Sequence, residues 1–275
     1  MNTFGKGALA PQTDIRDYKV AAAAAEYPKT WQVDYLPPVK NQKSVGSCVA
    51  HATSSILEYF DYKETGEKTT LSTDFIYGMQ GIAFGRMDSG MYLRDACKIV
   101  KQYGDCLKET ISTNTEQPKC AENLKEIIEK APTLLEKDIY KEAEQYQVKS
   151  YAKCTTDNSI KHALMNYGPV LGSVRWYDKN TVKGEVIEMD KTSSWGGHAI
   201  MIYGWNEIGW LCQNSWGKGW NGDGRFTVPY GEIKEAWSFV DAENDIDIIQ
   251  PKRGKWIDII YKAINMVINF FKSKR

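Results

Sequence analysis

Cys48, His198 and Asn214 lie far apart in the sequence but have the side-chain types that nucleophilic catalysis by a thiol requires. A cysteine becomes an effective nucleophile when a base takes its proton, a third group orients that base, and donors stabilise the developing oxyanion. The imidazole of His198 is a candidate base, and the amide of Asn214 can fix the tautomer of that imidazole. These residue types indicate acyl transfer through an acyl-enzyme intermediate.

The residues around Cys48 place it at the start of a helix. Gly46 and Ser47 precede it, and apolar residues recur at helical spacing over 49–60. Unpaired N–H groups and the helix dipole at such a position favour the thiolate. A buried, inert cysteine is the alternative, and it would be favoured if Cys48 stood alone. The candidate base and its orienting amide downstream favour the nucleophile instead.

His51 and His162 are the other histidines, and each has a structural interpretation. His51 follows Cys48 by three residues on the same predicted helix, so it competes with His198 as the base. We favour a structural role for His51, because a base on the nucleophile's own helix is poorly placed for a substrate that lies across a cleft. His162 is expected on a helix surface. His198 begins a strand pattern, although an exposed loop histidine is its alternative.

The elements that must position these residues change in type along the chain. The first half shows helical patterns and the second half shows short strands separated by turn residues. The predicted helices begin at Cys48 and cover Thr73–Met79, Leu93–Tyr103, Ala121–Gln145 with a break at Pro132, and Ser159–Asn166. The predicted strands are Val170–Trp176, Glu185–Met189, Ala199–Trp205, Trp210–Asn214 and Arg225–Val228. This order predicts an α+β fold with the nucleophile in one lobe and its base in the other.

Three segments resemble the papain family (C1-type) of cysteine peptidases. Pro38–Ala50 is similar to the family's PVKNQGSCGSCWA segment, Gly197–Gly204 to xHAVxxVGY, and Gln213–Gly224 to NSWGxxWGxxG. The resemblance implies a helical left lobe and an antiparallel β right lobe, with the active-site cleft between them. It also implies hydrolysis of peptide bonds by a thiolate–imidazolium pair, without a metal or an organic cofactor.

The resemblance assigns roles to individual residues. Cys48 attacks, His198 transfers the proton, Asn214 orients it, and the side chain of Gln42 donates to the oxyanion. Trp216 shields the His198–Asn214 hydrogen bond. The implied substrate-binding residues are Gly90, Met91, Tyr92, Gly197 and Trp220, with Trp220 on the leaving-group side and the others around the S2 pocket.

Composition bounds the possible partners and the compartment. The formal net charge is zero, so no general affinity for nucleic acid is expected. Residues 1–14 contain no apolar core of a secretory signal, and no apolar run is long enough to span a bilayer. Val45 stands where the family usually has a disulfide cysteine, and Cys97 and Cys212 fit core positions. Pairing among Cys106, Cys120 and Cys154 stays open, and a reducing, cytoplasmic location is favoured.

The two ends depart from the family pattern. We expect an N-terminal extension (1–36), a helical lobe (37–135), a sheet lobe (136–245) and a C-terminal helix (246–275). The extension is too short for the usual inhibitory prosegment, so either the enzyme is made active or these residues lie over the cleft. The tail from Lys252 carries seven basic residues and one acidic residue beside an apolar stripe that includes Trp256 and Phe271. Such a helix binds an anionic membrane surface or a protein partner, or packs on its own acidic body.

Two other classes of function remain beside peptide hydrolysis. An acyltransferase or effector would use the same three residues with an amine as acceptor in place of water. A non-catalytic papain-like binding module would need none of them, and the intact set counts against it. The peptidase is therefore the leading hypothesis.

Overall fold

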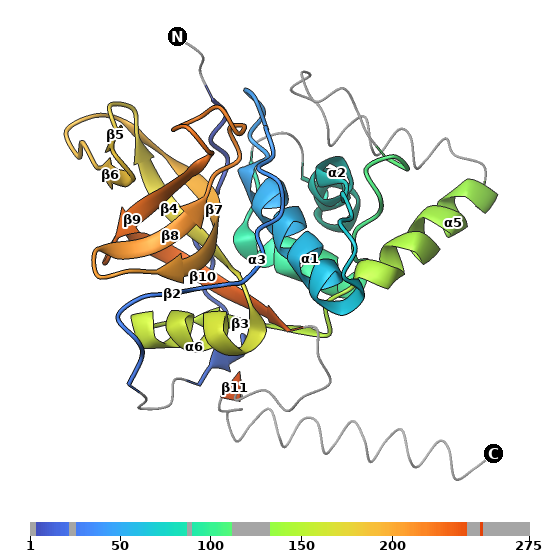
Figure 1. The fold of residues 1–275 in the computed structure, drawn as a ribbon. Coiled ribbons are helices and arrows are strands. Elements are labelled where there is room, and N and C mark those ends of the chain that lie inside the picture. The colour runs from blue at the N-terminus through green and yellow to red at the C-terminus, as the bar shows by residue number, and fades with distance from the viewer. Residues whose placement is uncertain (1–3, 22–25, 87–89, 112–132, 241–247, 250–275) are drawn as a thin grey trace.

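The structure, a computed structural model, describes residues 4–21, 26–86, 90–111, 133–240 and 248–249. Its helices are α1 (Cys48–Thr65), α2 (Thr73–Phe84), α3 (Leu93–Gln102), α5 (Thr133–Ala143) and α6 (Asp157–Tyr167), with a 3-10 turn at Glu144–Tyr146. Four of these helices, α1, α2, α3 and α5, gather in one half of the molecule (Figure 1). The strands form the other half, and no described helix is long and apolar enough to cross a membrane.

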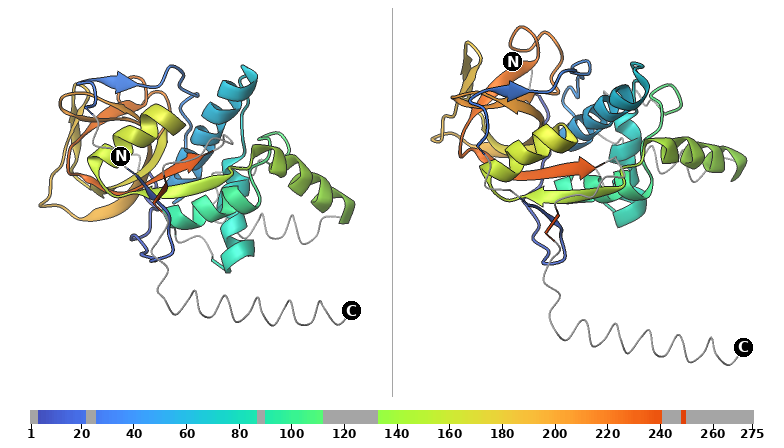
Figure 2. Two further views of the ribbon diagram at one scale, coloured as in Figure 1. Left: turned by 90° about the horizontal axis from the view of Figure 1, so that it is seen from below. Right: turned by 60° about the horizontal axis from the view of Figure 1, so that its bottom comes forward.

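The described strands join in one mixed, largely antiparallel sheet of order β11-β1-β3-β10-β4-β7-β8-β9-β6-β5, with β2 paired to β7. Their bounds are β1 (Lys19–Val20), β2 (Trp31–Gln32), β3 (Ser150–Cys154), β4 (Val170–Tyr177), β5 (Thr181–Lys183), β6 (Val186–Glu188), β7 (Trp195–Trp205), β8 (Gly209–Gln213), β9 (Arg225–Pro229), β10 (Ile233–Val240) and β11 (Ile248–Ile249). Helix α6 lies against β10 and β3 (Figure 2). The expected α+β fold with a helical half and a sheet half is confirmed.

Helix α1 connects the two halves. Every residue from Cys48 to Phe60 is buried, because the helix lies between strand β7 and helices α2 and α3. A helix enclosed on all sides is well suited to hold its first residue in a fixed position. It ends at Gly66, whose φ of 77° is the left-handed conformation that glycine adopts at helix ends.

The segment before α1 is fastened to both halves. The Lys40 ammonium lies 2.5 Å from the Glu58 carboxylate on α1, and both side chains are largely buried. On the other side, the N–H of Gly217 donates to the Lys40 carbonyl at 2.9 Å, and the N–H of Gln42 donates to the Ser215 carbonyl at 2.8 Å. These contacts bring Gln42 and the start of α1 next to the loop that follows β8.

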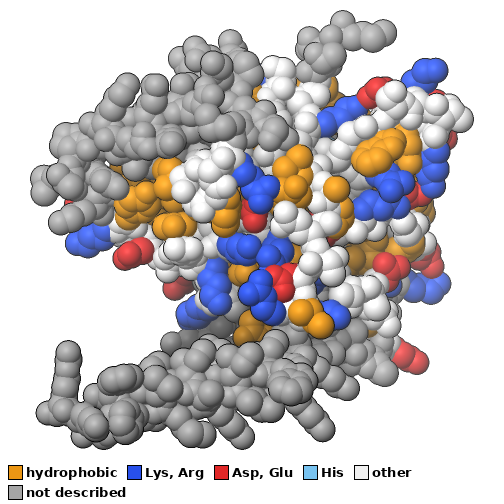
Figure 3. All heavy atoms as spheres, turned by 180° about the vertical axis from the view of Figure 1, so that it is seen from behind, with side chains coloured by type: hydrophobic (Ala, Val, Ile, Leu, Met, Phe, Trp, Pro, Cys, Tyr) orange, Lys and Arg blue, Asp and Glu red, His pale blue; other side chains and the backbone are white. Residues whose placement is uncertain are grey.

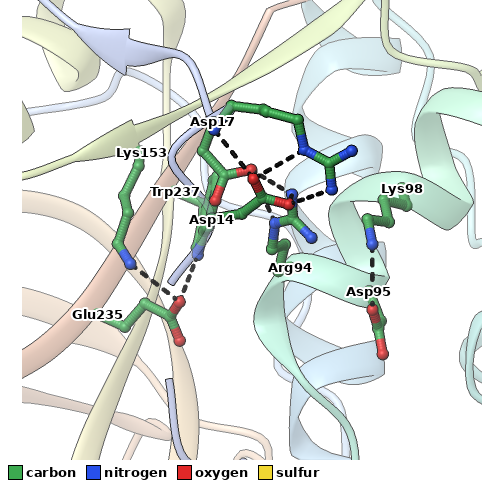
Figure 4. A network of polar contacts seen from close by, with 9 residues as sticks. Asp14, Asp17, Arg94, Asp95, Lys98, Lys153, Glu235 and Trp237 are labelled. Atoms are coloured by element: carbon green, nitrogen blue, oxygen red, sulfur yellow. Dashed lines mark hydrogen bonds and ion pairs between the residues drawn. The ribbon is translucent and has the colours of Figure 1, made fainter. Parts of the chain in front are cut away.

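A buried ionic cluster anchors the N-terminal segment to α3. Arg94 of α3 donates to Asp17 at 2.7 Å and to Asp14 at 2.8 Å, and Asp14 also accepts from Arg16 (Figure 4). The hydrogen bonds from Arg16, together with the charge of Arg94, hold the pKa of the Asp14 carboxyl well below its usual value. Through Arg94, residues 14–18 are attached to α3 in a way that does not depend on residues 4–9. On the face seen from behind, Lys and Arg side chains gather in the middle (Figure 3).

The differences from the predicted elements have local causes. Strand β7 begins at Trp195 rather than Ala199, so His198 lies inside a strand and not at its start. Strands β3 and β10 were not predicted, because each carries charged residues that mask the alternating pattern: Lys153 of β3 lies 3.6 Å from Glu235 of β10. Residues 121–132 and 250–275 lie outside the described residues, whereas Ile248–Ile249, at the start of the expected C-terminal helix, form strand β11.

Candidate active site

Cys48 is the first residue of α1, and its side chain is fully buried. Ser47 caps the helix without a side-chain hydrogen bond, so the first-turn N–H groups keep the unpaired character that favours an anion. Burial nevertheless raises the pKa of the Cys48 thiol, although the nearby backbone N–H groups of Ala199, Gly7 and Val49 act in the opposite direction.

His198 and Asn214 form the pair that the sequence predicts. His198 Nε2 lies 2.8 Å from Asn214 Oδ1, and the same oxygen accepts from the N–H of Ser215 at 2.8 Å. The bond from Ser215 identifies this atom as the amide oxygen, which can only accept hydrogen bonds. Nε2 must therefore be the donor and carries the imidazole proton. His198 Nδ1 is therefore the basic nitrogen, and within the described residues it has no hydrogen-bond partner.

Tryptophan side chains enclose the imidazole. Trp216 stacks on it with ring centroids 4.6 Å apart, and Trp176 approaches it edge-on at 5.4 Å. Trp220 packs against both tryptophans at 5.3 and 5.9 Å. This apolar burial lowers the pKa of His198 to about 4; the hydrogen bond to Asn214 acts against it and the Lys6 cation adds to it.

Gln42 is buried and lies beside Ser215, the residue that follows Asn214. Its Nε2 donates to the carbonyls of Gly5 at 3.0 Å and Val45 at 2.7 Å, and its Oε1 accepts from the Ser215 hydroxyl. The hydroxyl fixes the amide orientation, so the Nε2 group is the one directed at Gly5. A carbonyl of the chain's own N-terminus thus occupies a donor that the family resemblance assigns to an oxyanion.

Residues 4–9, here called the N-terminal strap, lie between the two halves above Cys48. The N–H of Ala8 donates to the Gly197 carbonyl at 3.0 Å on the sheet side. On the helical side, the Met91 N–H donates to Gly7 at 2.7 Å and the Leu9 N–H donates to Met91 at 3.0 Å, which is parallel pairing. The strap is therefore hydrogen-bonded to both halves, and it covers the thiol.

Two glycines allow the strap to lie this close to the helical half. A Cβ built on Gly5 would be 2.0 Å from the Val45 carbonyl oxygen, and one built on Gly7 would be 1.9 Å from that of Gly46. Real Cβ atoms do not approach backbone oxygens so closely. Glycine is required at both positions by this contact rather than by an unusual backbone conformation.

Three of the residues implied as substrate-binding, Gly90, Met91 and Gly197, lie against the strap. The backbone of Met91 pairs with it, and its side chain is buried. A Cβ on Gly90 would lie 2.3 Å from the Gly7 carbonyl oxygen, and one on Gly197 would lie 1.8 Å from that of Ala8. Tyr92 sits at the start of α3 with the Arg86 guanidinium 4.3 Å from its ring centroid.

The other histidines and cysteines have structural environments. His51 is buried, its Nδ1 lies 2.9 Å from the Ser47 carbonyl oxygen, and burial lowers its pKa to about 3. Cys106 and Cys154 are buried free thiols, as are Cys97 and Cys212, whereas Cys120 lies outside the described residues. Among the described residues, no group of three or more histidine, cysteine or acidic side chains is arranged to hold a metal ion.

The model of the papain family of cysteine proteases matches residues 28–239. The chain belongs to this family. A relative in Acanthamoeba polyphaga mimivirus, the uncharacterized peptidase C1-like protein L477, is 27% identical over 255 residues, covering 83% of this chain and 76% of that protein. Cathepsin K of Mus musculus is 24% identical over 204 residues, covering 69% of this chain and 55% of the cathepsin. This papain-family chain thus matches only about half of the cathepsin's length.

Solved structures share its fold. Xylellain, a cysteine protease from Xylella fastidiosa, has a TM-score of 0.73 at 21% identity, covering 88% of this chain and 98% of xylellain. The Carica candamarcensis cysteine protease CMS1MS2, solved in complex with E-64, has a TM-score of 0.59 at 17% identity, covering 79% of this chain and 100% of that one. These likenesses support the papain-like fold of the chain.

The family resemblance predicts Trp216 beside the imidazole, and the sequence allows residues 1–36 a place over the cleft, but neither singles out residues 4–9 or Trp176. The strap residues Gly5, Gly7 and Ala8 show no local pattern of a ligand, and only the alternation of small residues in Phe4–Ala8 hints at a closely packed extended segment. Trp176 was assigned to a strand without a role beside the imidazole. Both depend on contacts between segments that are distant in the chain.

Proposed function

We propose that this papain-family chain hydrolyses peptide bonds, with Cys48 as nucleophile, His198 as base, Asn214 as its orienting group and Gln42 as an oxyanion donor. As the Cys48 sulfur attacks the scissile carbonyl, His198 Nδ1 would take the thiol proton, and it would then give that proton to the leaving amine as the peptide bond breaks. Water activated by the same nitrogen would then release the acyl group. The observation that carries the proposal is the His198–Asn214 hydrogen bond, which leaves Nδ1 as the basic nitrogen.

We also propose that the strap holds this site inactive. It buries Cys48 and engages Gln42 Nε2, so a substrate reaches neither group until the strap leaves. The Gly7 carbonyl accepts from the Met91 N–H and not from Gln42. The strap's Gly7 carbonyl therefore lacks the Gln42 hydrogen bond that would polarise it for attack by the thiol. We therefore expect the strap to inhibit without being cut. The Arg94 cluster would keep a displaced strap tethered and able to rebind.

A dye-linked peptide substrate tests both proposals. The full-length Gly7→Val variant, whose strap cannot seat, should release dye faster than the wild type, and adding Cys48→Ala should abolish release. Turnover that survives Cys48→Ala would contradict the assigned nucleophile. Turnover that is equal in the wild type and Gly7→Val would contradict inhibition by the strap.

Product analysis separates hydrolysis from acyl transfer. With an added amine acceptor, a peptidase mainly yields the free carboxylic acid, whereas an acyltransferase joins the acyl group to the amine. We expect the acid to dominate. No described contact favours an acceptor other than water, so acyl transfer remains the second candidate.

A further inference from the structure

The side chains of the strap alternate between the two halves of the molecule. Phe4 and Lys6 contact residues of the sheet half, whereas side chains at Gly5 and Gly7 would point at the backbone of Val45 and Gly46. An extended chain presents alternate residues to opposite sides. The strap therefore marks where side chains of an extended ligand meet the sheet half.

Lys6 lies along Gly196 and reaches a carboxylate of the sheet half. Its ammonium pairs with Asp178, which directly follows β4 and whose N–H donates to the Ser194 carbonyl at 2.8 Å. Its aliphatic stem crosses Gly196, where a built Cβ would lie 3.0 Å from Lys6 Cδ. The absence of a side chain at Gly196 leaves room for a long stem, and Asp178 supplies the charge that a basic group prefers.

Phe4 covers an aromatic surface beside the base. It stacks on Trp216 with ring centroids 4.9 Å apart and planes 11° apart. Trp216 itself stacks on His198 and, with Phe4 in place, is only 5% exposed. Trp220, which the family resemblance places on the leaving-group side, packs against Trp216 at 5.3 Å, whereas Gly7 and Leu9 pair with Met91, which the resemblance places at the S2 pocket. Phe4 and Lys6 therefore lie on the side where a leaving group departs.

We infer that Trp216, Gly196 and Asp178 form a subsite for the leaving-group side of a peptide substrate, and that this subsite selects a basic residue. The inference rests on the proposed peptidase function and names its substrate class. Displacement of the strap removes Lys6 and leaves the Asp178 carboxylate available to a substrate cation. Two other cations are near Asp178 in the sequence. The Arg175 guanidinium lies over the Trp195 ring, 4.7 Å from its centroid, and Lys179 is exposed to solvent.

Quenched peptides that share one acyl side and carry Lys, Ala or Glu at the first or second position after the scissile bond test the inference. In the full-length Gly7→Val background, kcat/KM should favour Lys over Glu about two- to five-fold, the range of an exposed ion pair. High salt should reduce the preference. Asp178→Asn should abolish it and Asp178→Lys should reverse it. The matched variant Asp223→Asn, which removes a comparably exposed carboxylate, should retain it.

Binding measurements keep the inference separate from the proposed activity. A labelled peptide with the sequence of residues 4–9 should bind the Cys48→Ala/Gly7→Val chain, and a Lys-to-Glu change in that peptide should weaken binding about two- to five-fold. With Asp178→Asn the same change should have no effect. Equal binding of the Lys and Glu peptides to the Cys48→Ala/Gly7→Val chain, in which Asp178 is retained, would overturn the inference that Asp178 selects a basic residue. Failure of every peptide to be hydrolysed, with discrimination in binding retained, would count against the peptidase alone.

Discussion

Replacing Gly7 by valine should open the strap and expose Cys48. The first added atom would lie 1.9 Å from the Gly46 carbonyl oxygen and 2.4 Å from its carbon. Both are backbone atoms that cannot rotate away, so the strap must move. In the open state residue 7 has no such neighbour, and the strain acts on the closed state alone.

The size of the effect follows from the packing. Overpacking a close contact costs about 1–3 kcal/mol. Because each 1.4 kcal/mol is a factor of ten, the ratio of open to closed molecules should rise about 5- to 150-fold. The two strap hydrogen bonds to Met91 and the Phe4–Trp216 stacking oppose opening equally in both proteins, so they do not enter the ratio.

Alkylation of Cys48 by iodoacetamide, followed by mass spectrometry, measures the open fraction. The thiol is fully buried while the strap is seated, so its rate should rise by the same factor in Gly7→Val. Ala10→Val is the matched control, because Ala10 is exposed just beyond the strap and its rate should equal that of the wild type. An unchanged rate in a normally folded Gly7→Val protein would refute the reasoning.

Three further predictions concern charged and titratable residues. His198→Ala should remove most turnover in the Gly7→Val background, whereas His51→Phe should retain it; the reverse result would exchange their roles. Lys40→Met should lower the free energy of unfolding in urea by about 3 kcal/mol, because it leaves the buried Glu58 carboxylate without its cation. Lower pH should open the strap: burial lowers the pKa of His198 to about 4, and the strap's Lys6 cation adds to this effect. Displacement of the strap removes that cation and raises the pKa of His198, so the closed state is favoured at neutral pH and loses stability as pH falls towards 4. The protection factor of the Ala8 amide, which is its intrinsic exchange rate divided by its observed rate, should fall in that window, and a pH-independent protection factor would contradict this coupling.

The places of Cys48, His198 and Asn214 in the fold could be predicted from the sequence because the signals are local. Cys48 begins a helix that its own neighbours specify, and the hydrogen bond between His198 and Asn214 depends on two adjacent strands of one sheet. The strap could not be predicted in the same way. The contact between Ala8 and Gly197 joins segments from opposite ends of the chain, and its register depends on space that only the assembled halves define.

The sheet was predicted in part for a related reason. Strands such as β4 are buried along most of their length and show continuous apolar patterns. Strand β10 contains Lys234 and Glu235, and Glu235 is buried only because Lys153 and the Trp237 indole lie beside it (Figure 4). A buried charge with a distant partner has the same appearance in a sequence as a solvent-exposed charge.

Labelling with the epoxide inhibitor E-64, followed by peptide mapping, tests the central claim most directly. The full-length Gly7→Val protein should form a single covalent adduct on Cys48, and addition of His198→Ala should slow its formation strongly. The wild type should label more slowly than Gly7→Val. An adduct on any other cysteine, or efficient peptide hydrolysis by a protein in which Cys48 is replaced by alanine, would contradict the assignment of Cys48 as the nucleophile.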